Sequence, residues 1–431
     1  MYVELYVSLL ILIGAMAASV PVFMALFFTS LVGIAYFTDM PVLSIAQALF
    51  LSMDNFALVV VLFFVLCGNI MTTGSIVDRL VKLANVVVGW LPGGLGMAGI
   101  IACGLFGAIS GSTVATVVAI GGFMIPALLE QNYSPRYTVG VMTSSPILGI
   151  IIPPSISMIM YSMVTHCSIE KLFMTGYVPG FYIMIGFCAY TYYVCRKGRQ
   201  QRLPVPTLSL FWGTFKESFW SLMLPVLIFV GIFSGAFTPN EAAIIACVYA
   251  YLVELLIHRT MKFNQVFKVT VNSAVTSATL LIIVAGATCF GRYLTLKGIP
   301  TMITEAVVAN VNSQWVFLLA MNVFFLIVGC FMDIISATLI LTPIILPLLY
   351  KFNINILHFG LLMTVNLGIG YITPPVGVSL YITGAMVNRD VIYVTRSIMP
   401  FLLIQIVILM LLTYWPESVL FLPRLWFGNV D

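Results

Sequence analysis

Residues 104–154 read GLFGAISGSTVATVVAIGGFMIPALLEQNYSPRYTVGVMTSSPILGIIIPP, and this stretch decides the fold. It is apolar enough to lie in a bilayer, yet the polar run 110–113 interrupts its first hydrophobic segment and the pair Pro153-Pro154 interrupts its second. Non-helical backbone at membrane depth is tolerated only where it is buried in protein or lines a cavity. The stretch therefore predicts two broken membrane segments that face a protected cavity.

The whole chain has the composition of a membrane protein. Of its 431 residues, 61% are hydrophobic and only 7% are charged, whereas soluble domains carry roughly 25% charged residues. Apolar runs of about 20 residues cross a hydrocarbon core of about 30 Å, so we predict an all-α polytopic membrane protein. Residues 2–37 are long enough to cross once or twice. A net charge of +4, scattered along the chain, argues against nucleic-acid binding.

The interrupted pattern returns later in the chain at one constant spacing without a gap, which we call the repeat offset. Six residues of the first copy are repeated at this offset: Pro126, Asn132, Thr143, Gly149, Pro153 and Pro154 match Pro347, Asn353, Thr364, Gly370, Pro374 and Pro375. We interpret residues 1–202 and 217–431 as two related halves and residues 203–216 as their linker. Each half is predicted to hold a re-entrant helical hairpin (94–129 and 314–350) and a broken span (134–165 and 355–386). Paired broken segments are the best sequence pointer to a transporter's binding site.

Lysine and arginine placement predicts the orientation of the two halves. The cluster Arg196, Lys197, Arg199 and Arg202 is assigned to the cytoplasm, because basic residues favour that side. Counting spans outward from this cluster, the first hairpin enters from the cytoplasm and the second enters from outside. The repeats are therefore predicted to be inverted, which is the symmetry of many secondary transporters.

The first hairpin tip carries polar groups suited to a binding site. Ser110, Ser112 and Thr113 supply hydroxyls, and Gly111 allows a tight backbone turn. Helix N-termini attract carboxylates, while free carbonyl oxygens suit a hard cation such as sodium. The alternative interpretation is a seam of small residues at which two helices pack closely.

The double prolines predict specific free carbonyls. A proline lacks the N–H that would bond the carbonyl four residues back, so Pro153 frees Gly149 and Pro154 frees Ile150. In the second half, Pro374 would free Gly370 and Pro375 would free Tyr371. Two related groups of oxygens predict two cation sites. The alternative is a pair of simple proline kinks.

Asp333 lies in the second hairpin tip, aligned by the repeat offset with Ser112. An ionisable residue at membrane depth is a functional hypothesis by default, so this carboxylate is predicted to serve a cation site or to bind a proton. Ser336 adds a hydroxyl nearby, and Asn366 lies one turn before Gly370. The alternative role of Asp333 is that of a helix cap.

Six motifs in order resemble the large membrane subunit of tripartite ATP-independent periplasmic (TRAP) transporters, over essentially the whole chain. They are GAISGSTVAT (107–116), IPALLEQNYSPRY (125–137), LGIIIPPSI (148–156), GAFTPNEAA (235–243), FMDIISATLILTPIILP (331–347) and NLGIGYITPPVG (366–377). The resemblance implies an elevator-type importer of organic acids across the bacterial inner membrane, with Na⁺ as coupling ion and no organic cofactor. It also implies two partners, a small membrane subunit of four helices and a periplasmic substrate-binding protein. Because the chain begins with the large subunit's first segment, the small subunit is expected to be a separate polypeptide.

The resemblance also implies site residues. One sodium site would involve Ser110, Ser112, Gly149, Ile152 and Pro154, and the second would involve Gly329, Asp333, Gly370, Thr373 and Val376. The candidates for substrate binding are Gly111, Thr113, Pro153, Ser336, Asn366 and Pro374. Pro146 stands where the family often has a small residue, and it is expected to reshape the substrate pocket. Dicarboxylates, sialic acid and other sugar or keto acids all remain open as substrates.

Three other classes of function compete with this interpretation. A self-sufficient divalent-anion/sodium symporter would share the inverted hairpins but need no binding protein. A passive channel is disfavoured, because half-length hairpins that enter from opposite faces suit alternating access. A membrane-embedded enzyme is disfavoured, because the apolar segments contain no catalytic constellation.

Overall fold

The computed structural model describes residues 2–18, 20–54, 57–196, 198, 200, 202–311, 313–374 and 377–428. In this part of the chain, helices joined by turns and short connections make up the structure, and there are no strands. The first half contains α1 (Tyr2–Ala17), α2 (Val22–Phe37), α3 (Leu43–Met53), α4 (Ala57–Thr73), α5 (Ile76–Val88), α6 (Gly94–Ser110), α7 (Thr113–Thr116), the π-helical turn η1 (Val117–Gly121), α8 (Gly122–Glu130), α9 (Pro135–Ser144), the 3₁₀ turn η2 (Ser145–Ile147), α10 (Leu148–Ile151), α11 (Ile156–Thr165) and α12 (Ile169–Cys195).

The rest of the chain, from residue 208 on, has fewer interruptions. It contains α13 (Leu208–Phe233), α14 (Pro239–Leu252), the π-helical turn η3 (Val253–Ile257), α15 (Phe263–Leu296), α16 (Ile299–Asn310), α17 (Gln314–Phe331), α18 (Ile334–Lys351), α19 (Ile356–Gly370), α20 (Val378–Val387), α21 (Val391–Tyr414) and α22 (Glu417–Phe427). Within the described residues, nine helices are long and apolar enough to cross a membrane, or up to ten if a bent pair counts as one span. The predicted polytopic all-α class is confirmed.

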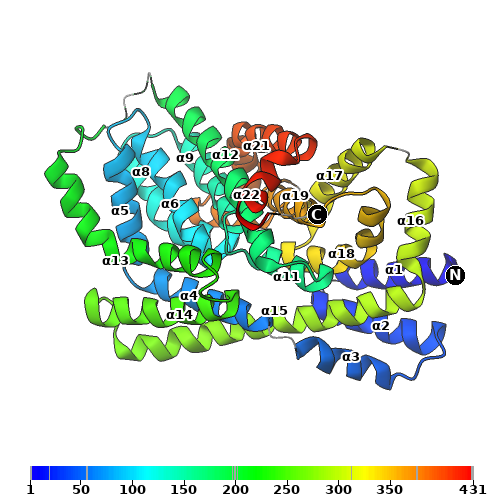
Figure 1. Ribbon diagram of the computed structural model, residues 1–431. Coiled ribbons are helices and arrows are strands. Elements are labelled where there is room, and N and C mark those ends of the chain that lie inside the picture. Colours follow the sequence, from blue (N-terminus) through cyan, green and yellow to red (C-terminus); the bar gives the residue numbers. More distant parts are fainter. Residues whose placement is uncertain are drawn as a thin grey trace.

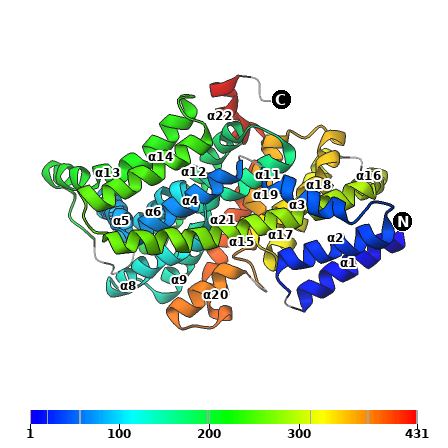
Figure 2. The ribbon, with the colours of Figure 1, turned by 90° about the horizontal axis from the view of Figure 1, so that it is seen from below.

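The molecule is elongated along α15. This helix runs from the end where α5, α13 and α14 gather to the end where α1, α2 and α3 gather (Figures 1 and 2). Between the two ends lie the hairpin helices and broken spans, with α12 packed on α6 and α21 packed on α9. The large side chains buried in this central body include Phe106, Tyr161 and Phe359.

Both hairpins break where the sequence predicts. In the first, α6 ends at Ser110 and α7 begins at Thr113. In the second, α17 ends at Phe331 and α18 begins at Ile334. Both predicted broken spans are also interrupted: residues 152–155 separate α10 from α11, and residues 371–377 separate α19 from α20. Pro375 and Val376 lie outside the described residues.

Backbone features recur at the same offset as the sequence identities. Asn132 and Asn353, which follow the two hairpins, have φ angles of 62° and 51°. Two residues later, the side chains of Ser134 and Asn355 cap α9 and α19 by accepting backbone N–H groups. Asparagine tolerates left-handed backbone better than most residues, and short polar side chains are preferred caps. The same turn chemistry therefore joins hairpin to broken span in both halves.

Several boundaries differ from the predicted ones. The proposed linker 203–216 is extended only over 203–207, because Thr207 caps α13 by accepting the N–H of Leu210 at 3.3 Å. Residues 2–37 form two helices that meet near Pro21. The sequence interpretation placed no helix at α3 or α22. Both are short, and their patterns are weak beside those of the long apolar runs.

Candidate functional site

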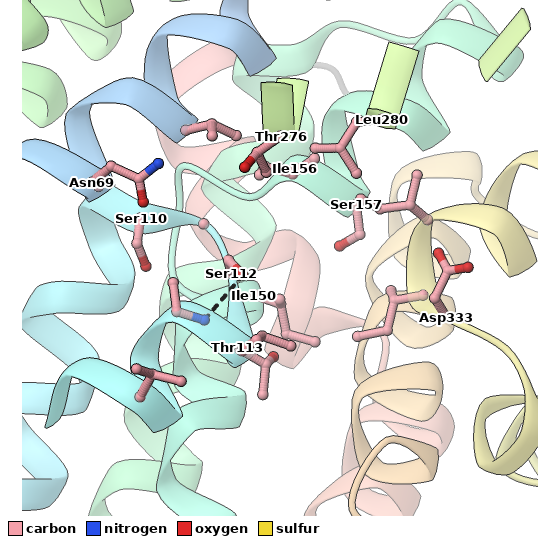
Figure 3. Close-up of a pocket in the computed structure, with 18 of the residues that line it drawn as sticks. Asn69, Ser110, Ser112, Thr113, Ile150, Ile156, Ser157, Thr276, Leu280 and Asp333 are labelled. Atoms are coloured by element: carbon pink, nitrogen blue, oxygen red, sulfur yellow. Dashed lines mark hydrogen bonds between the residues drawn. The ribbon is translucent and has the colours of Figure 1, made fainter. Parts of the chain in front are cut away.

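A cavity of about 760 Å³ lies where the two hairpin tips approach each other. Both hairpins, both broken spans (the second through Tyr371) and the helices α4 and α15 line it. The lining residues include Gly68, Asn69 and Thr72 of α4, residues 110–115 of the first tip, Ile150, Ile156 and Ser157 of the broken span, Thr276 and Leu280 of α15, and Asp333 and Ile334 of the second tip. Figure 3 shows Ser110 and Ser112 on one side of this space and Asp333 on the other. The fold thus gathers residues from both halves around one space.

The first tip is a tight turn that hydrogen bonds hold. Gly111 has a φ of +59°, and a Cβ atom there would lie 2.9 Å from the carbonyl oxygen of Pro154. Ser112 is extended, and its Oγ accepts the backbone N–H of Ala115 at 3.4 Å. The hydroxyl of Thr116 donates to the carbonyl oxygen of Ser112 at 2.7 Å. Only glycine fits position 111 without strain.

The first broken span lies directly against this tip. A Cβ atom on Gly107 would be 2.4 Å from the Cα of Gly149, and a Cβ atom on Gly149 would be 2.7 Å from Thr116 Oγ1. No described backbone N–H donates to the carbonyl of Gly149 or of Ile150, as the proline argument predicts. Free carbonyls therefore lie beside a tip that is rich in hydroxyls.

The second tip is built in a similar way but carries a charge. Asp333 Oδ2 accepts the backbone N–H of Ser336 at 2.8 Å, so this carboxylate caps α18 while it lines the cavity. A Cβ atom on Gly370 would lie 2.6 Å from the Cα of Gly329, so hairpin and broken span again meet backbone to backbone. Asp333 is the only charged side chain among the described lining residues.

The predicted free carbonyls of the second half are wrong. The carbonyl oxygen of Gly370 accepts the N–H of Thr373 at 2.9 Å, and that of Tyr371 accepts the N–H of Ser379 at 3.3 Å. After Gly370 the chain forms a tight turn, in which the N–H of Thr373 donates to the carbonyl of Gly370. Together with the N–H of Ser379, it takes the place of the N–H groups that the two prolines lack. In the first half Ile152 is extended instead, so the chain leaves Gly149 and makes no such turn.

The structure separates the predicted site residues by position. Ser110, Gly111, Ser112, Thr113 and Asp333 line the cavity, and the buried hydroxyl of Thr113 has no hydrogen-bond partner among the described residues. The other predicted residues do not line it. Ile152 lines a separate cavity between α6, α12 and α13, Val376 lies outside the described residues, and the remaining five are Gly149, Pro154, Gly329, Gly370 and Thr373.

Four candidates for substrate binding also lie away from the cavity. Pro153 lines a second, almost entirely apolar cavity of about 440 Å³ between α6, α12 and α13. Asn366 donates to Asn322 Oδ1 at 2.8 Å inside the α17–α19 contact. Ser336 is buried next to its cap, and Pro374 is exposed. In this conformation only Gly111 and Thr113 of the six candidates face the cavity.

The structure adds residues that sequence reasoning missed. Asn69 faces the cavity from α4, and its Nδ2 donates to Ser273 Oγ of α15 at 2.9 Å. Thr116 lies between the tip and Gly149, as described above. In the sequence, Asn69 is visible only as an amide inside the apolar run VLFFVLCGNIMTT. Its role at the cavity becomes clear only from its contact with α15.

Comparison with known proteins identifies the family. The profile of the tripartite ATP-independent periplasmic transporter, DctM component, matches residues 9–418. The chain belongs to this family. It is 37% identical over 430 residues to the C4-dicarboxylate TRAP transporter large permease protein DctM of Rhodobacter capsulatus, covering 96% of this chain and 98% of that protein.

More distant similarities agree with this membership. The DctM-family chain is 31% identical over 422 residues to the sialic acid TRAP transporter permease protein SiaT of Haemophilus influenzae, covering 98% of this chain and 68% of that protein. Its fold resembles the YdaH transporter of Alcanivorax borkumensis, with a TM-score of 0.62, 13% identity and coverage of 86% and 87% of the two chains. That identity shows a shared fold alone. As a DctM component with many apolar helices, the chain is a multi-pass protein of the bacterial inner membrane.

Proposed function

We propose that this chain is the transport subunit of a sodium-driven importer of an organic acid anion. A periplasmic binding protein would deliver the substrate, and a separate four-helix membrane subunit would complete the transporter. The observation that carries the proposal is the single cavity between two hairpin tips that come from different halves of the chain. Transporter folds with repeated halves place substrate and coupling-ion sites near such broken helices.

The first sodium site would use the oxygen atoms around the first tip. Ser110 Oγ lies 3.5 Å from Thr116 Oγ1, which in turn bonds the carbonyl of Ser112. Gly149, whose carbonyl accepts no described backbone N–H, packs against the same threonine. Hydroxyl and carbonyl oxygens are ligands that suit a hard cation. Ile152 and Pro154, just beyond the broken helix, would complete this site.

The second sodium site would use the charge of Asp333. Its Oδ2 already accepts one N–H, which leaves the other carboxylate oxygen for a cation. Gly329 and Gly370 contact each other where the hairpin and the broken span meet, and Thr373 and Val376 would complete this site. The carbonyl of Gly370 has a second lone pair, so its bond to Thr373 does not prevent ligation.

Cavity electrostatics favour coupled binding of sodium and substrate. The described lining residues include Asp333 but no lysine or arginine. An anion that entered this space alone would meet a negative charge in surroundings of low dielectric constant. Bound Na⁺ would reverse that balance, so the anion should bind well only after sodium. Hydroxyls such as Thr113 and the amide of Asn69 would then orient the substrate.

Movement of the hairpins would follow from their packing. The two broken spans touch closely, since a Cβ atom on Gly368 would lie 2.6 Å from Ile150 Cδ1 and one on Gly360 would lie 2.5 Å from Tyr161 Cε1. Hairpins and broken spans would therefore move as one body against the scaffold helices, as an elevator mechanism requires. Interiors packed this closely shift as units and do not deform continuously.

Uptake in proteoliposomes tests the proposal. Vesicles that contain this chain and its small membrane subunit should accumulate an organic acid, with C4-dicarboxylates and sialic acid tried first. We expect accumulation only with an inward sodium gradient and the cognate binding protein. Uptake without the binding protein would instead favour a self-sufficient anion/sodium symporter. Flux that persists after the ion gradient is dissipated would indicate a channel.

A further inference from the structure

Glu254 is a buried carboxylate that is not among the described residues lining the cavity. It lies in the π-helical turn η3 after α14 and is 0% exposed. Its Oε1 accepts the backbone N–H groups of Ser75 at 2.8 Å and of Ile76 at 2.9 Å, and its Oε2 accepts the hydroxyl of Thr260. None of the described basic side chains forms an ion pair with it. The negative charge of this carboxylate is therefore stabilised mainly by backbone N–H groups at the start of α5.

The contact between Glu254 and residues 75–76 joins the turn η3 to the N-terminus of α5. The first N–H groups of a helix have no partner within it, and a negative charge there is stabilising. Glu254 meets this need for α5, which packs on α6 of the first hairpin and on α13. The join is closely fitted, because a Cβ atom on Gly74 would lie 2.2 Å from Glu254 Cδ. Position 74 must therefore be glycine for the carboxylate to reach the helix end.

A second glutamate makes a related contact at the other end of the molecule. Glu4 of α1 forms an ion pair with Lys297 at 3.0 Å. Lys297 is the C-cap of α15, and after Gly298 the chain enters the short helix α16, which packs on α18 of the second hairpin. Lys297 also corresponds to Ile76 at the repeat offset. In the first half, a glutamate binds the backbone at the start of the helix that leads to the hairpin. In the second half, a glutamate binds the side chain of the residue that caps α15, just before α16 begins.

The helices that neighbour these two contacts lie far apart in the fold. The end of the molecule with α5, α13 and α14 and the end with α1 and α16 lie at opposite ends of α15 (Figures 1 and 2). A glycine lies beside each contact: Gly74 directly precedes Ser75, and Gly298 follows Lys297 with a φ of +64°. Chain segments that absorb changes in φ and ψ are where hinges form.

We propose that Glu254 and Glu4 are positioning residues that anchor α5 and α16 to the scaffold, so that each hairpin moves about a fixed point. This inference rests on the proposed function, because it assumes that the hairpins move. Neither glutamate touches the cavity. Loss of an anchor should therefore slow the transport cycle and leave the binding of substrate and sodium intact.

The first test measures backbone opening and does not depend on transport. Hydrogen–deuterium exchange of the intact chain with its small subunit should quicken about ten-fold at the first amides of α5 in Glu254→Ala, and less in Glu254→Gln, which keeps one acceptor. Gly74→Ala, which displaces the same carboxylate, should act like Glu254→Ala. Glu130→Ala, an exposed glutamate at the end of α8, is the matched control and should change nothing. Unchanged exchange in both Glu254→Ala and Gly74→Ala would overturn the anchor.

The second test measures uptake in proteoliposomes at equal amounts of folded protein. Glu254→Ala should lower the maximal rate about ten-fold while KM for substrate and the half-saturating sodium concentration stay within about two-fold, with Glu254→Gln intermediate. Glu4→Lys and Lys297→Glu should each slow uptake, and the double variant should restore it. Unchanged maximal rates, or a raised KM as the main effect, would overturn the positioning role. Failure of the wild-type chain to show sodium-driven uptake would instead refute the proposed function, while the exchange test would still decide the anchor.

Discussion

Ser112 and Asp333 are separated by the repeat offset and occupy the same place in the two hairpins. Each lies at the N-terminus of the helix after the break, and each accepts the backbone N–H three residues on, at 3.4 Å from Ala115 and at 2.8 Å from Ser336. The two donors are themselves related by the same offset. The two tips thus have similar backbone caps, but the first is neutral and the second carries a carboxylate. The cavity between them is therefore acidic on the side of the second tip.

Replacing Asp333 can separate its two roles. Asp333→Asn keeps an oxygen that can cap α18 but removes the charge, so we expect normal thermal stability and an apparent sodium affinity that is at least about ten-fold weaker. Asp333→Ala should also lose the cap, at a cost of about 1 kcal/mol. Sodium dependence of uptake and thermal denaturation measure the two effects. Equal sodium affinity in wild type and Asp333→Asn would show that the residue is a cap only.

Gly149→Ala should separate the first tip from its broken span. The added Cβ atom would lie 2.7 Å from Thr116 Oγ1 and 3.1 Å from the carbonyl of Ser112. Overpacking of this kind costs about 1–3 kcal/mol, and we expect sodium-dependent uptake to fall at least about ten-fold. Gly121→Ala is the matched control, because its nearest neighbour would be Met386 Cε at 3.7 Å, an ordinary contact. If both variants transport alike, close packing at Gly149 is not required.

Substitutions of Thr116 test whether its hydroxyl oxygen contributes to the first sodium site. Thr116→Val keeps the shape of the side chain but removes the hydroxyl that bonds the carbonyl of Ser112 at 2.7 Å. Thr116→Ser keeps the hydroxyl. We expect the valine variant to need several-fold more sodium for half-maximal uptake and the serine variant to resemble wild type, because only the first loses an oxygen. Titration of uptake against sodium decides between these outcomes.

Asn322 should matter for stability, because it holds a buried chain of amides. Asn366 Nδ2 donates to its Oδ1, and its own Nδ2 donates to Thr413 Oγ1, both at 2.8 Å. Asn322→Leu leaves both partners short of a bond, which we expect to cost about 0.6–1.7 kcal/mol. Asn310→Leu, at an exposed amide that bonds only its own helix, is the control. Thermal denaturation of the two purified variants would contradict the role if their midpoints fell equally.

The helix breaks could be predicted from the sequence because they depend on local chemistry. Glycine, serine and proline inside apolar runs mark the breaks near Ser112 and Gly149 whatever lies around them. The helices α3 and α22 are short, so their patterns carried too little signal. The carbonyl of Gly370 was predicted to be free because the missing proline N–H was considered alone. The turn after it supplies another donor, which the covalent chain does not reveal.

The sequence alone was enough to identify a multi-pass membrane protein with interrupted helices, because composition and residue spacing act over a few turns of one segment. Which side chains from distant segments come into contact became known only from the tertiary structure. It placed Asp333 across a cavity from Ser110, directed Asn366 into a buried amide chain, and brought Glu254 to the start of α5 from a distant part of the chain. Such contacts depend on how whole helices pack, and packing of distant segments leaves no local pattern.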